Sequence, residues 1–343
     1  MPETVPFSEG LLDTHCVVDV RTPLEFNEDH LPGAINVPLL SNDERVEIGI
    51  LYKQAGPYPA RIRGLELTAS RFPTMVDEIA GTANGRPILA YCWRGGLRSQ
   101  TVATILELTG HRVLQLKGGY KSFRHHVTTF FEAFHPPGSL VVIHGMTGIG
   151  KTDFIHTIDR NRYGIIDLEG LACHRGSAFG ALGLSQEHLT QKRFETIVWD
   201  AFRQLPPGRP VIVEGESRRI GKLSLPGNLY DVMRSGIKVW CTATLETRVK
   251  RLIAEYGRPE YKEEMTIALG RIAKRLGGDV YKELLGALER WDMEAFMSGL
   301  VVRYYDKVYY KTRDWVEEFE ISLEDYEEAA RRLAQELEMR GIN

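Results

Sequence analysis

A cysteine followed by a loop rich in glycine and arginine is the most chemically informative feature of this chain. Cys92 follows the apolar run 87–91 and precedes a helical pattern over residues 100–108. Loop amides and a helix N-terminus direct partial positive charge at the sulfur, which favours the thiolate and lets an anion bind beside it. A cysteine that merely fills a core needs neither arginines nor glycines. We predict Cys92 as the catalytic thiol and, as residues binding an anionic donor, Arg94, Gly95, Gly96 and Arg98.

A second glycine-rich loop, residues 145–152, fits the pattern G-x4-G-K-[ST] at every position. It follows the apolar strand pattern 140–144 and precedes a helical pattern over 153–159. The backbone amides of such a loop turn inward around phosphate oxygens, the lysine adds a positive charge, and the threonine hydroxyl can meet Mg²⁺. The predicted phosphate-binding residues are Gly145, Gly148, Gly150, Lys151 and Thr152.

Acidic and basic residues elsewhere in the second half of the chain are further candidates. Glu214 and Glu216 end the apolar strand pattern 210–213, where an acid of a P-loop enzyme lies near the metal or the reacting phosphate. A salt bridge at the strand end is the alternative interpretation of these two acids. The candidate phosphate contacts among the bases are Arg175, Arg218, Arg248 and Arg251.

Two other features allow a chemical and an ordinary interpretation. Residues 301–311 interleave tyrosines with bases, a pattern on which single-stranded RNA bases can stack, although tyrosines more often pack inside proteins. Cys173 lies in a polar, glycine-rich segment and is either a second functional thiol or a loop residue. The sequence leaves the role of Cys173 open.

Length and composition narrow the class of protein. A chain of 343 residues predicts two domains, and 43% hydrophobic with 26% charged residues is typical of a soluble protein. We expect no membrane span, because no apolar run reaches about 18 residues. We expect no secretion signal, because residues 1–6 have neither a basic n-region nor an apolar h-region. Four scattered cysteines predict reduced thiols in the cytoplasm, with neither a disulfide framework nor a resident metal site.

The order of the expected elements predicts an α/β fold. In the first half, short strand patterns at residues 15–20, 87–91 and 113–116 alternate with helical patterns, which indicates a parallel sheet. In the second half, strand patterns at 163–166 and 239–243 join those at 140–144 and 210–213. A Pro/Gly hinge near residue 135 separates the halves.

The first half resembles a rhodanese domain. Segments 17–26, 30–38, the Cys92 loop and 116–119 follow the order of that family's motifs. The spacing Cys-x5-Arg is one residue longer than in most rhodaneses and resembles the loop of rhodanese-like phosphatases, which accepts a tetrahedral oxyanion. We therefore predict a rhodanese-like parallel-sheet domain with a linker helix over residues 1–134. A P-loop NTPase- or kinase-like α/β domain with a C-terminal helical region is predicted over residues 135–343.

The combination of the two cassettes resembles the tRNA 2-selenouridine synthase family. That resemblance implies replacement of sulfur by selenium at C2 of a wobble 2-thiouridine, with selenophosphate as donor after S-alkylation by geranyl diphosphate. It implies that Cys92 carries selenium, that Arg94 and Arg98 hold the donor's phosphoryl group, and that Lys151 and Thr152 grip a diphosphate. Expected partners are the tRNA anticodon loop, which the four candidate arginines would contact, and a selenophosphate-supplying enzyme. No tightly bound cofactor is expected, with Mg²⁺ as a candidate ion.

Two alternatives stay open at this point. The chain could be a sulfurtransferase fused to an ATP-dependent kinase, because a P-loop recognises phosphates and does not choose between ATP and geranyl diphosphate. It could instead be a phosphatase-like binding module that uses the Cys-x5-Arg loop on a phosphoester. The sequence does not determine the tRNA species, the order of the steps or the oligomeric state.

Overall fold

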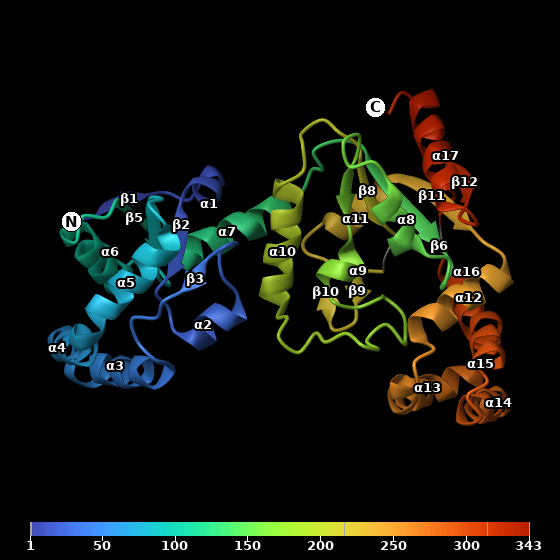
Figure 1. The fold of residues 1–343 in the computed structure, drawn as a ribbon, viewed down its shortest axis with the longest axis horizontal. Helices are drawn as coiled ribbons and strands as arrows, with labels where there is room; N and C mark the ends of the chain where they lie inside the picture. The colour runs from blue at the N-terminus through green and yellow to red at the C-terminus, as the bar shows by residue number, and fades with distance from the viewer. Residues whose placement is uncertain (1, 216, 314, 343) are drawn as a thin grey trace. The chain divides into compact units, whose positions relative to one another are not determined.

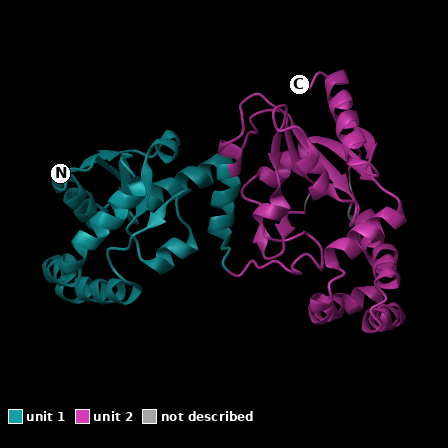
Figure 2. Cartoon of the chain, viewed as in Figure 1, with its two compact units in different colours: residues 1–132, 188–200 teal, residues 133–187, 201–343 magenta. Residues whose placement is uncertain are grey.

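The computed structural model describes residues 2–215, 217–313 and 315–342. The chain divides into two compact units, drawn in different colours in Figure 2. Unit 1 contains Met1–Glu132 and His188–Asp200, and unit 2 contains Ala133–Glu187 and Ala201–Asn343. The predicted domain boundary lies between residues 134 and 135; no feature of the sequence indicated that residues 188–200 pack with the first unit.

Unit 1 is built on a five-stranded parallel sheet in the order β1-β5-β4-β2-β3 (Figure 1). Its strands are β1 (Glu3–Val5), β2 (Cys16–Asp19), β3 (Ile35–Asn36), β4 (Ile88–Tyr91) and β5 (Val113–Leu116). Its helices are α1 (Gly10–Thr14), α2 (Pro23–Glu28), α3 (Asn42–Ala55), α4 (Pro57–Thr68), α5 (Phe72–Ala83), α6 (Leu97–Leu108) and α7 (Gly119–Glu132). Strands β2 and β4 are buried along their whole length, because helices cover both faces of a parallel sheet.

Unit 2 is built on a second five-stranded parallel sheet, in the order β12-β11-β6-β8-β7. Its strands are β6 (Leu140–Gly145), β7 (Gly164–Ile166), β8 (Val211–Glu214), β11 (Ile237–Thr242) and β12 (Phe319–Ser322), and β9 (Arg219–Ile220) pairs with β10 (Leu223–Ser224) in a small hairpin. The helices around this sheet are α8 (Lys151–Thr157), α9 (Leu168–Leu171), α11 (Leu229–Ser235), α12 (Leu245–Tyr256) and α17 (Tyr326–Met339). The predicted α/β class is confirmed in both halves.

Two further helical parts complete the chain. A helical group with its own apolar core contains α13 (Lys262–Leu276), α14 (Gly278–Glu289), α15 (Met293–Leu300), a π-helix (Val301–Tyr305) and α16 (Asp306–Thr312). Helix α10 (Gln191–Arg203) belongs to unit 1 up to Asp200 and to unit 2 from Ala201. In each sheet, the glycine-rich loop with predicted chemistry follows the carboxyl end of an inner strand, where ligands of open parallel sheets bind.

Candidate functional sites

The Cys92 loop connects β4 to the N-terminus of α6, as the sequence predicted. The Cys92 side chain is only 3% exposed. Its Sγ accepts hydrogen bonds from the Gly96 amide at 3.3 Å and from the Ser99 hydroxyl at 3.2 Å. Two donors on one sulfur can stabilise negative charge that develops there during a reaction. Ser99, which the sequence analysis did not single out, is therefore part of this site.

Gln115 holds the backbone of this loop from the neighbouring strand β5. Its Nε2 donates to the carbonyl oxygens of Gly95 at 3.0 Å and Gly96 at 3.2 Å, and to Ser99 Oγ at 2.9 Å. In a trans peptide the C=O and the N–H point in opposite directions. With both carbonyls turned toward Gln115, the amides of Gly96 and Leu97 point the other way, into the loop. The sequence signal for this role was a single polar residue, Gln115, inside the apolar strand pattern 113–116.

Glycine is required where the loop approaches the segment after β5. A Cβ on Gly95, whose φ is +65°, would lie 2.6 Å from the Leu116 carbonyl oxygen. A Cβ on Gly119, whose φ is +57°, would lie 2.2 Å from the Cys92 carbonyl oxygen. That oxygen accepts a hydrogen bond from the Tyr120 amide at 2.8 Å. The motif at 116–119 therefore serves as a backbone support for the Cys92 loop.

Arg98 is held in place by Glu25 from helix α2. Two hydrogen bonds, Nη1 to Oε2 at 2.6 Å and Nη2 to Oε1 at 3.1 Å, join the guanidinium to the carboxylate. Burial raises the pKa of Glu25, but the Arg98 guanidinium outweighs it and the pKa lies below its ordinary value. Arg94 is exposed at the mouth of the loop. Sequence reasoning missed Glu25, whose partner lies 73 positions away.

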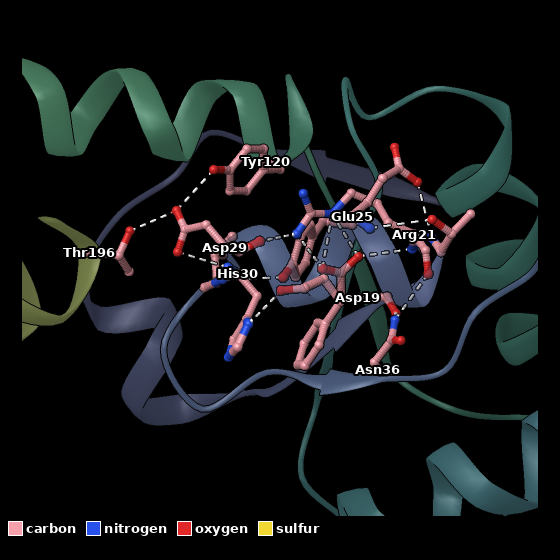
Figure 3. Close-up of polar contacts among 12 residues, drawn as sticks. Asp19, Arg21, Glu25, Asp29, His30, Asn36, Tyr120 and Thr196 are labelled. Atoms are coloured by element: carbon pink, nitrogen blue, oxygen red, sulfur yellow. Dashed lines mark hydrogen bonds and ion pairs between the residues drawn. The ribbon is translucent and has the colours of Figure 1, made fainter. Parts of the chain in front are cut away.

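A buried polar network in unit 1 includes Asp19, Arg21, Asp29 and Tyr120 (Figure 3). Tyr120 connects it to the Cys92 loop, because its amide donates to the Cys92 carbonyl. Arg21 binds both Asp19 carboxylate oxygens and donates to the Asp29 carbonyl at 2.7 Å, and its guanidinium lies 4.0 Å from the centroid of the Tyr120 ring. The fully buried Asp29 carboxylate accepts from the Tyr120 hydroxyl at 2.9 Å and from the Thr196 hydroxyl at 2.8 Å. Burial raises the pKa of Asp29 above its ordinary value, although these two hydroxyls oppose the shift. The network ties residues 188–200 to the support of the Cys92 loop.

The P-loop of unit 2 connects β6 to α8 with the predicted geometry. Gly148 and Gly150 have φ of +81° and +82°. A Cβ on Gly150 would lie 2.0 Å from the Tyr326 hydroxyl, and a Cβ on Gly148 would lie 2.8 Å from Leu252. Only glycine fits both positions, because the conformation and the space exclude a side chain.

Two of the predicted arginines bind the P-loop backbone. Arg251 donates to the Ile149 carbonyl at 2.7 Å and to the Leu323 carbonyl at 2.6 Å. Arg248 donates to the Thr147 carbonyl at 3.0 Å, and its terminal nitrogens pair with Asp306 at 2.6 and 3.1 Å. By turning loop carbonyls outward, these side chains orient the loop amides inward. Arg248 is largely buried, so its contact with a phosphate or tRNA stays a prediction without support from this geometry.

Thr152 lies between two carboxylates. Its hydroxyl donates to Glu214 at 2.6 Å and also lies 3.1 Å from Glu169, and the Glu169 amide donates to Glu214 at 3.1 Å. Burial, followed by the negative charges of Glu169 and Asp167, raises the pKa of Glu214 to about 8. Hydroxyl and carboxylate oxygens are ligands that Mg²⁺ prefers, and a cation would offset the buried charge, so these residues fit the ion. Glu216, the other predicted acid, lies outside the described residues.

A cavity of about 1540 Å³ opens in front of the P-loop, entirely within unit 2. Among the described residues, its lining contains many more cations than carboxylates, which favours a polyanionic ligand. The cations are Lys151, Arg175, Arg219, Arg234, Lys238, Arg251, Arg271, Arg275 and Arg313, and the carboxylates are Asp153, Glu169 and Glu255. Arg175, a predicted contact, lines the cavity and pairs with Glu255. Arg218 lies over the Tyr230 ring, 6.0 Å from its centroid.

Aromatic rings form part of the cavity wall. The π-helix and α16 contribute Tyr304, Tyr305 and Tyr309, so part of the aromatic segment 301–311 lines the cavity while Tyr304 is also packed into the helical core. The Trp315 ring packs against His144 at a tilt of 34°, with ring centroids 3.9 Å apart, and its centroid lies 4.7 Å from the Arg313 guanidinium. Burial, and then nearby positive charges, lower the pKa of His144 to about 3, so this imidazole is neutral.

Known families account for both halves of the chain. The model of the tRNA 2-selenouridine synthase AAA domain matches residues 138–339, and that of the rhodanese-like domain matches residues 7–126. The tRNA 2-selenouridine synthase of Hydrogenovibrio crunogenus is 34% identical over 338 residues, covering 90% of this chain and 92% of the relative. The chain belongs to the tRNA 2-selenouridine synthase family.

Other members of the tRNA 2-selenouridine synthase family match over similar lengths. The synthase of Pseudomonas putida is 32% identical over 340 residues, covering 90% of each chain. That of Cupriavidus necator is 33% identical over 339 residues, covering 90% of this chain and 91% of the relative. Membership makes the chain an enzyme with both cassettes in the family's order.

The remaining sequence predictions can be placed within this family member. Cys173 is exposed and is not part of the cavity lining. Within the described ranges, no cluster of three or more histidine, cysteine or acidic side chains could hold a metal by itself. None of the helices in the described part of the chain is both long and apolar enough to cross a bilayer.

Proposed function

We propose that this enzyme replaces sulfur by selenium at C2 of a wobble 2-thiouridine in tRNA, through an S-geranyl intermediate. The observation that carries the proposal is the presence of two anion-binding loops on one chain, only one of which contains a nucleophile. The Cys92 loop suits a covalent step on a phosphorylated donor, and the P-loop suits binding of a diphosphate. Selenophosphate and geranyl diphosphate, the donors expected from the family, match this division.

The P-loop cavity is the proposed site of S-alkylation. The thiocarbonyl sulfur attacks C1 of the geranyl group, the C1–O bond breaks, diphosphate leaves with the electron pair, and N3 of the uracil loses its proton. The inward amides and Lys151 would hold the diphosphate as charge develops on it. Mg²⁺ bound by Thr152 and Glu214 would neutralise that charge further. The cavity exceeds the roughly 300–1,000 Å³ of ordinary ligand pockets, which leaves room for the acceptor nucleotide and makes the aromatic wall a candidate stacking surface.

Selenium enters in the second step. A selenium nucleophile derived from selenophosphate adds to C2, and geranylthiol departs while N3 regains a proton. Alkylation is needed first because a thiocarbonyl sulfur leaves poorly and a thiol leaves well. The acceptor base must be splayed from the anticodon stack, since C2 is inaccessible in stacked RNA. An enzyme that makes selenophosphate would have to supply the donor, and we expect the reaction in the cytoplasm.

A ligand titration of thermal stability tests the proposal against its alternatives. A ligand that binds only the folded protein raises the melting temperature. Stabilisation by geranyl diphosphate supports the synthase, and stabilisation by ATP with Mg²⁺ alone supports the kinase fusion. Stabilisation by neither supports a phosphatase-like module and contradicts the proposed use of the P-loop.

Mass spectrometry of wobble nucleosides tests the chemistry directly. Geranyl diphosphate alone should convert 2-thiouridine to its S-geranyl form, and both donors together should give 2-selenouridine. Selenophosphate alone should leave 2-thiouridine unchanged. Selenouridine formed without the prenyl donor would overturn the proposed intermediate.

A further inference from the structure

The Cys92 thiolate can attack a selenophosphate at selenium or at phosphorus, and the two reactions differ in electron balance. Attack at selenium forms an S–Se bond and leaves the P–Se electron pair on phosphorus, which becomes phosphite. The selenium on sulfur would then need a two-electron reductant before it could enter uridine as selenide. Attack at phosphorus changes the oxidation state of neither phosphorus nor selenium, so it needs no reductant.

A thiol that could supply those electrons is missing near Cys92 in the described part of unit 1. Strands β2 and β4 are parallel, with Cys16 opposite Ile88 and Asp19 opposite Tyr91. Cys16 therefore lies at the start of β2, whereas Cys92 follows the end of β4. The other two cysteines, Cys173 and Cys241, belong to unit 2. Within the described part of unit 1, Cys92 therefore has no resolving thiol of the kind that redox cysteines use.

We propose that Cys92 attacks phosphorus and that the loop acts as a selenophosphate-cleaving phosphatase, an inference that rests on the proposed use of selenophosphate. The S–P bond forms, the P–Se bond breaks, and the electron pair leaves on selenium as hydroselenide. Selenium stays at the selenide level that 2-selenouridine requires. Water then cleaves the S–P bond of the phosphocysteine, which gives inorganic phosphate and restores the thiolate. The released hydroselenide is the nucleophile that attacks C2.

The loop geometry suits a phosphoryl group above the sulfur. The Gly96 amide donates to Sγ, and the Leu97 amide points into the loop. Both residues are exposed, so an anion can reach the loop from solvent. Arg98 donates one N–H from each terminal nitrogen to Glu25. A guanidinium has five N–H donors, so three are left that could bind a phosphoryl oxygen. The proton of hydroselenide comes from the donor itself, monohydrogen selenophosphate, in which it lies on selenium as the P–Se bond breaks. The leaving anion is then weakly basic, and the first step needs no general acid from the protein.

Ser99 has a distinct task in the second step. When water attacks the phosphocysteine, the Cys92 thiolate is the leaving group, and a donor on its sulfur lowers the barrier. The Ser99 hydroxyl lies 3.2 Å from Sγ and is held by Gln115. Ser99→Ala should therefore slow release of phosphate by about ten- to a hundredfold, the worth of one hydrogen bond to a charged group. Phosphocysteine should accumulate in that variant.

The experiment follows phosphorus in the full-length enzyme with selenophosphate and without tRNA. ³¹P NMR should detect inorganic phosphate and no phosphite, and ¹⁸O from labelled water should enter the phosphate. Acid-quenched Ser99→Ala protein should carry one phosphoryl group on the peptide containing Cys92. Cys92→Ala should lose phosphate release, and the matched control Cys173→Ser should retain it. Phosphite as product, selenium on Cys92, or undiminished phosphate release by Cys92→Ala would overturn the inference.

A parallel reaction separates this inference from the proposed function. Pre-geranylated tRNA with selenophosphate should give 2-selenouridine in the same preparation. If selenouridine forms while phosphite accumulates, the proposed function stands and attack at phosphorus is wrong. If phosphocysteine forms but neither 2-thiouridine nor its S-geranyl form is converted, attack at phosphorus stands and the proposed function is wrong.

Discussion

The two glycine-rich loops share a position in their sheets and differ in what surrounds them. Each follows an inner parallel strand and precedes a helix, and each has its carbonyls turned outward by side chains from elsewhere in its unit. Gln115 does this for the Cys92 loop, and Arg248 and Arg251 do it for the P-loop. In both loops a carbonyl points outward to a side chain, and the N–H of the same peptide therefore points into the loop.

The differences separate covalent chemistry from binding. The Cys92 loop encloses a buried sulfur with two donors on it. The P-loop opens on a large cavity and has Glu169 and Glu214 beside Thr152, where a cation would be stabilised. A similar backbone therefore surrounds a buried sulfur in one unit and borders a cation-rich cavity in the other.

Removal of the thiol should have the largest effect. Cys92→Ala should lower selenium incorporation by about a thousandfold or more, because a nucleophile has no substitute in a covalent step. S-geranylation of the same tRNA should be unchanged, since the P-loop is in the other unit. Nucleoside mass spectrometry measures both products, with Cys173→Ser as the control. Loss of geranylation in Cys92→Ala would show that the two loops do not act independently.

Removal of the P-loop lysine should produce the opposite pattern. Lys151→Ala should weaken geranyl diphosphate binding by about ten- to a hundredfold, the worth of one charge-assisted hydrogen bond. Thermal-shift titration measures this change, and Lys222→Ala, at an exposed cation of unit 2, is the control. Selenation of pre-geranylated tRNA should survive in Lys151→Ala. Its loss would assign the P-loop to the selenium step as well.

The support of Arg98 should matter less than the groups that react. Glu25→Gln keeps the size of the side chain but removes the charge that holds Arg98, and should slow selenation about tenfold, or about 1.4 kcal/mol in the barrier. Glu47→Gln, which removes the charge from an exposed pair with Arg63, is the matched control and should leave the rate unchanged. Equal effects of the two changes on the selenation rate would contradict the proposal that Glu25 positions Arg98 for the reaction.

The smallest effect is expected on stability, at the buried polar network of unit 1. Thr196→Val removes a hydroxyl that donates to the buried Asp29 carboxylate, and should lower the free energy of unfolding by about 1–3 kcal/mol near neutral pH. The pKa of Asp29 is raised in the folded protein, so its ionisation disfavours the folded state as pH rises through that pKa. The hydroxyl offsets part of this penalty, and its loss should matter less in acid, where Asp29 is protonated.

Urea unfolding of unit 1 at several pH values measures this dependence. Thr128→Val is the control, because the Thr128 hydroxyl is exposed and bonds only to the Arg124 carbonyl of its own helix. A deficit for Thr196→Val that does not shrink in acid would contradict the role given to the Asp29 carboxylate.

The sequence could predict those parts of the sites that are local in the chain. Cys92 and Lys151 were found because strand, loop and helix follow one another without interruption, so apolar runs and glycines mark each loop. Glu25, Gln115 and Glu169 were not found as site residues, because each reaches its loop from another element. Their partners are set by strand order and crossover geometry, which leave no periodic signal.

The short strands at the sheet edges were missed for a related reason. β1 has three residues and β12 has four, and each pairs only with a strand far from it in the chain. Segments this short have too few alternations to show a period of two. The place of residues 188–200 in unit 1 was missed as well. A helical pattern shows that a helix has an apolar face, but it does not show which unit that face packs against.

Helix α10 has a consequence for how the protein is made on the ribosome. Trp199 is fully buried, with its ring 5.4 Å from those of Phe123 and His126, and Thr196 covers Asp29. These residues are synthesised after β6, the P-loop and β7 of unit 2, although they complete unit 1. The Cys92 loop therefore gains its full buried support only when the P-loop has already been translated. A nascent chain that stops before α10 leaves an unfinished apolar surface on the rhodanese-like half, where chaperones and aggregation would act.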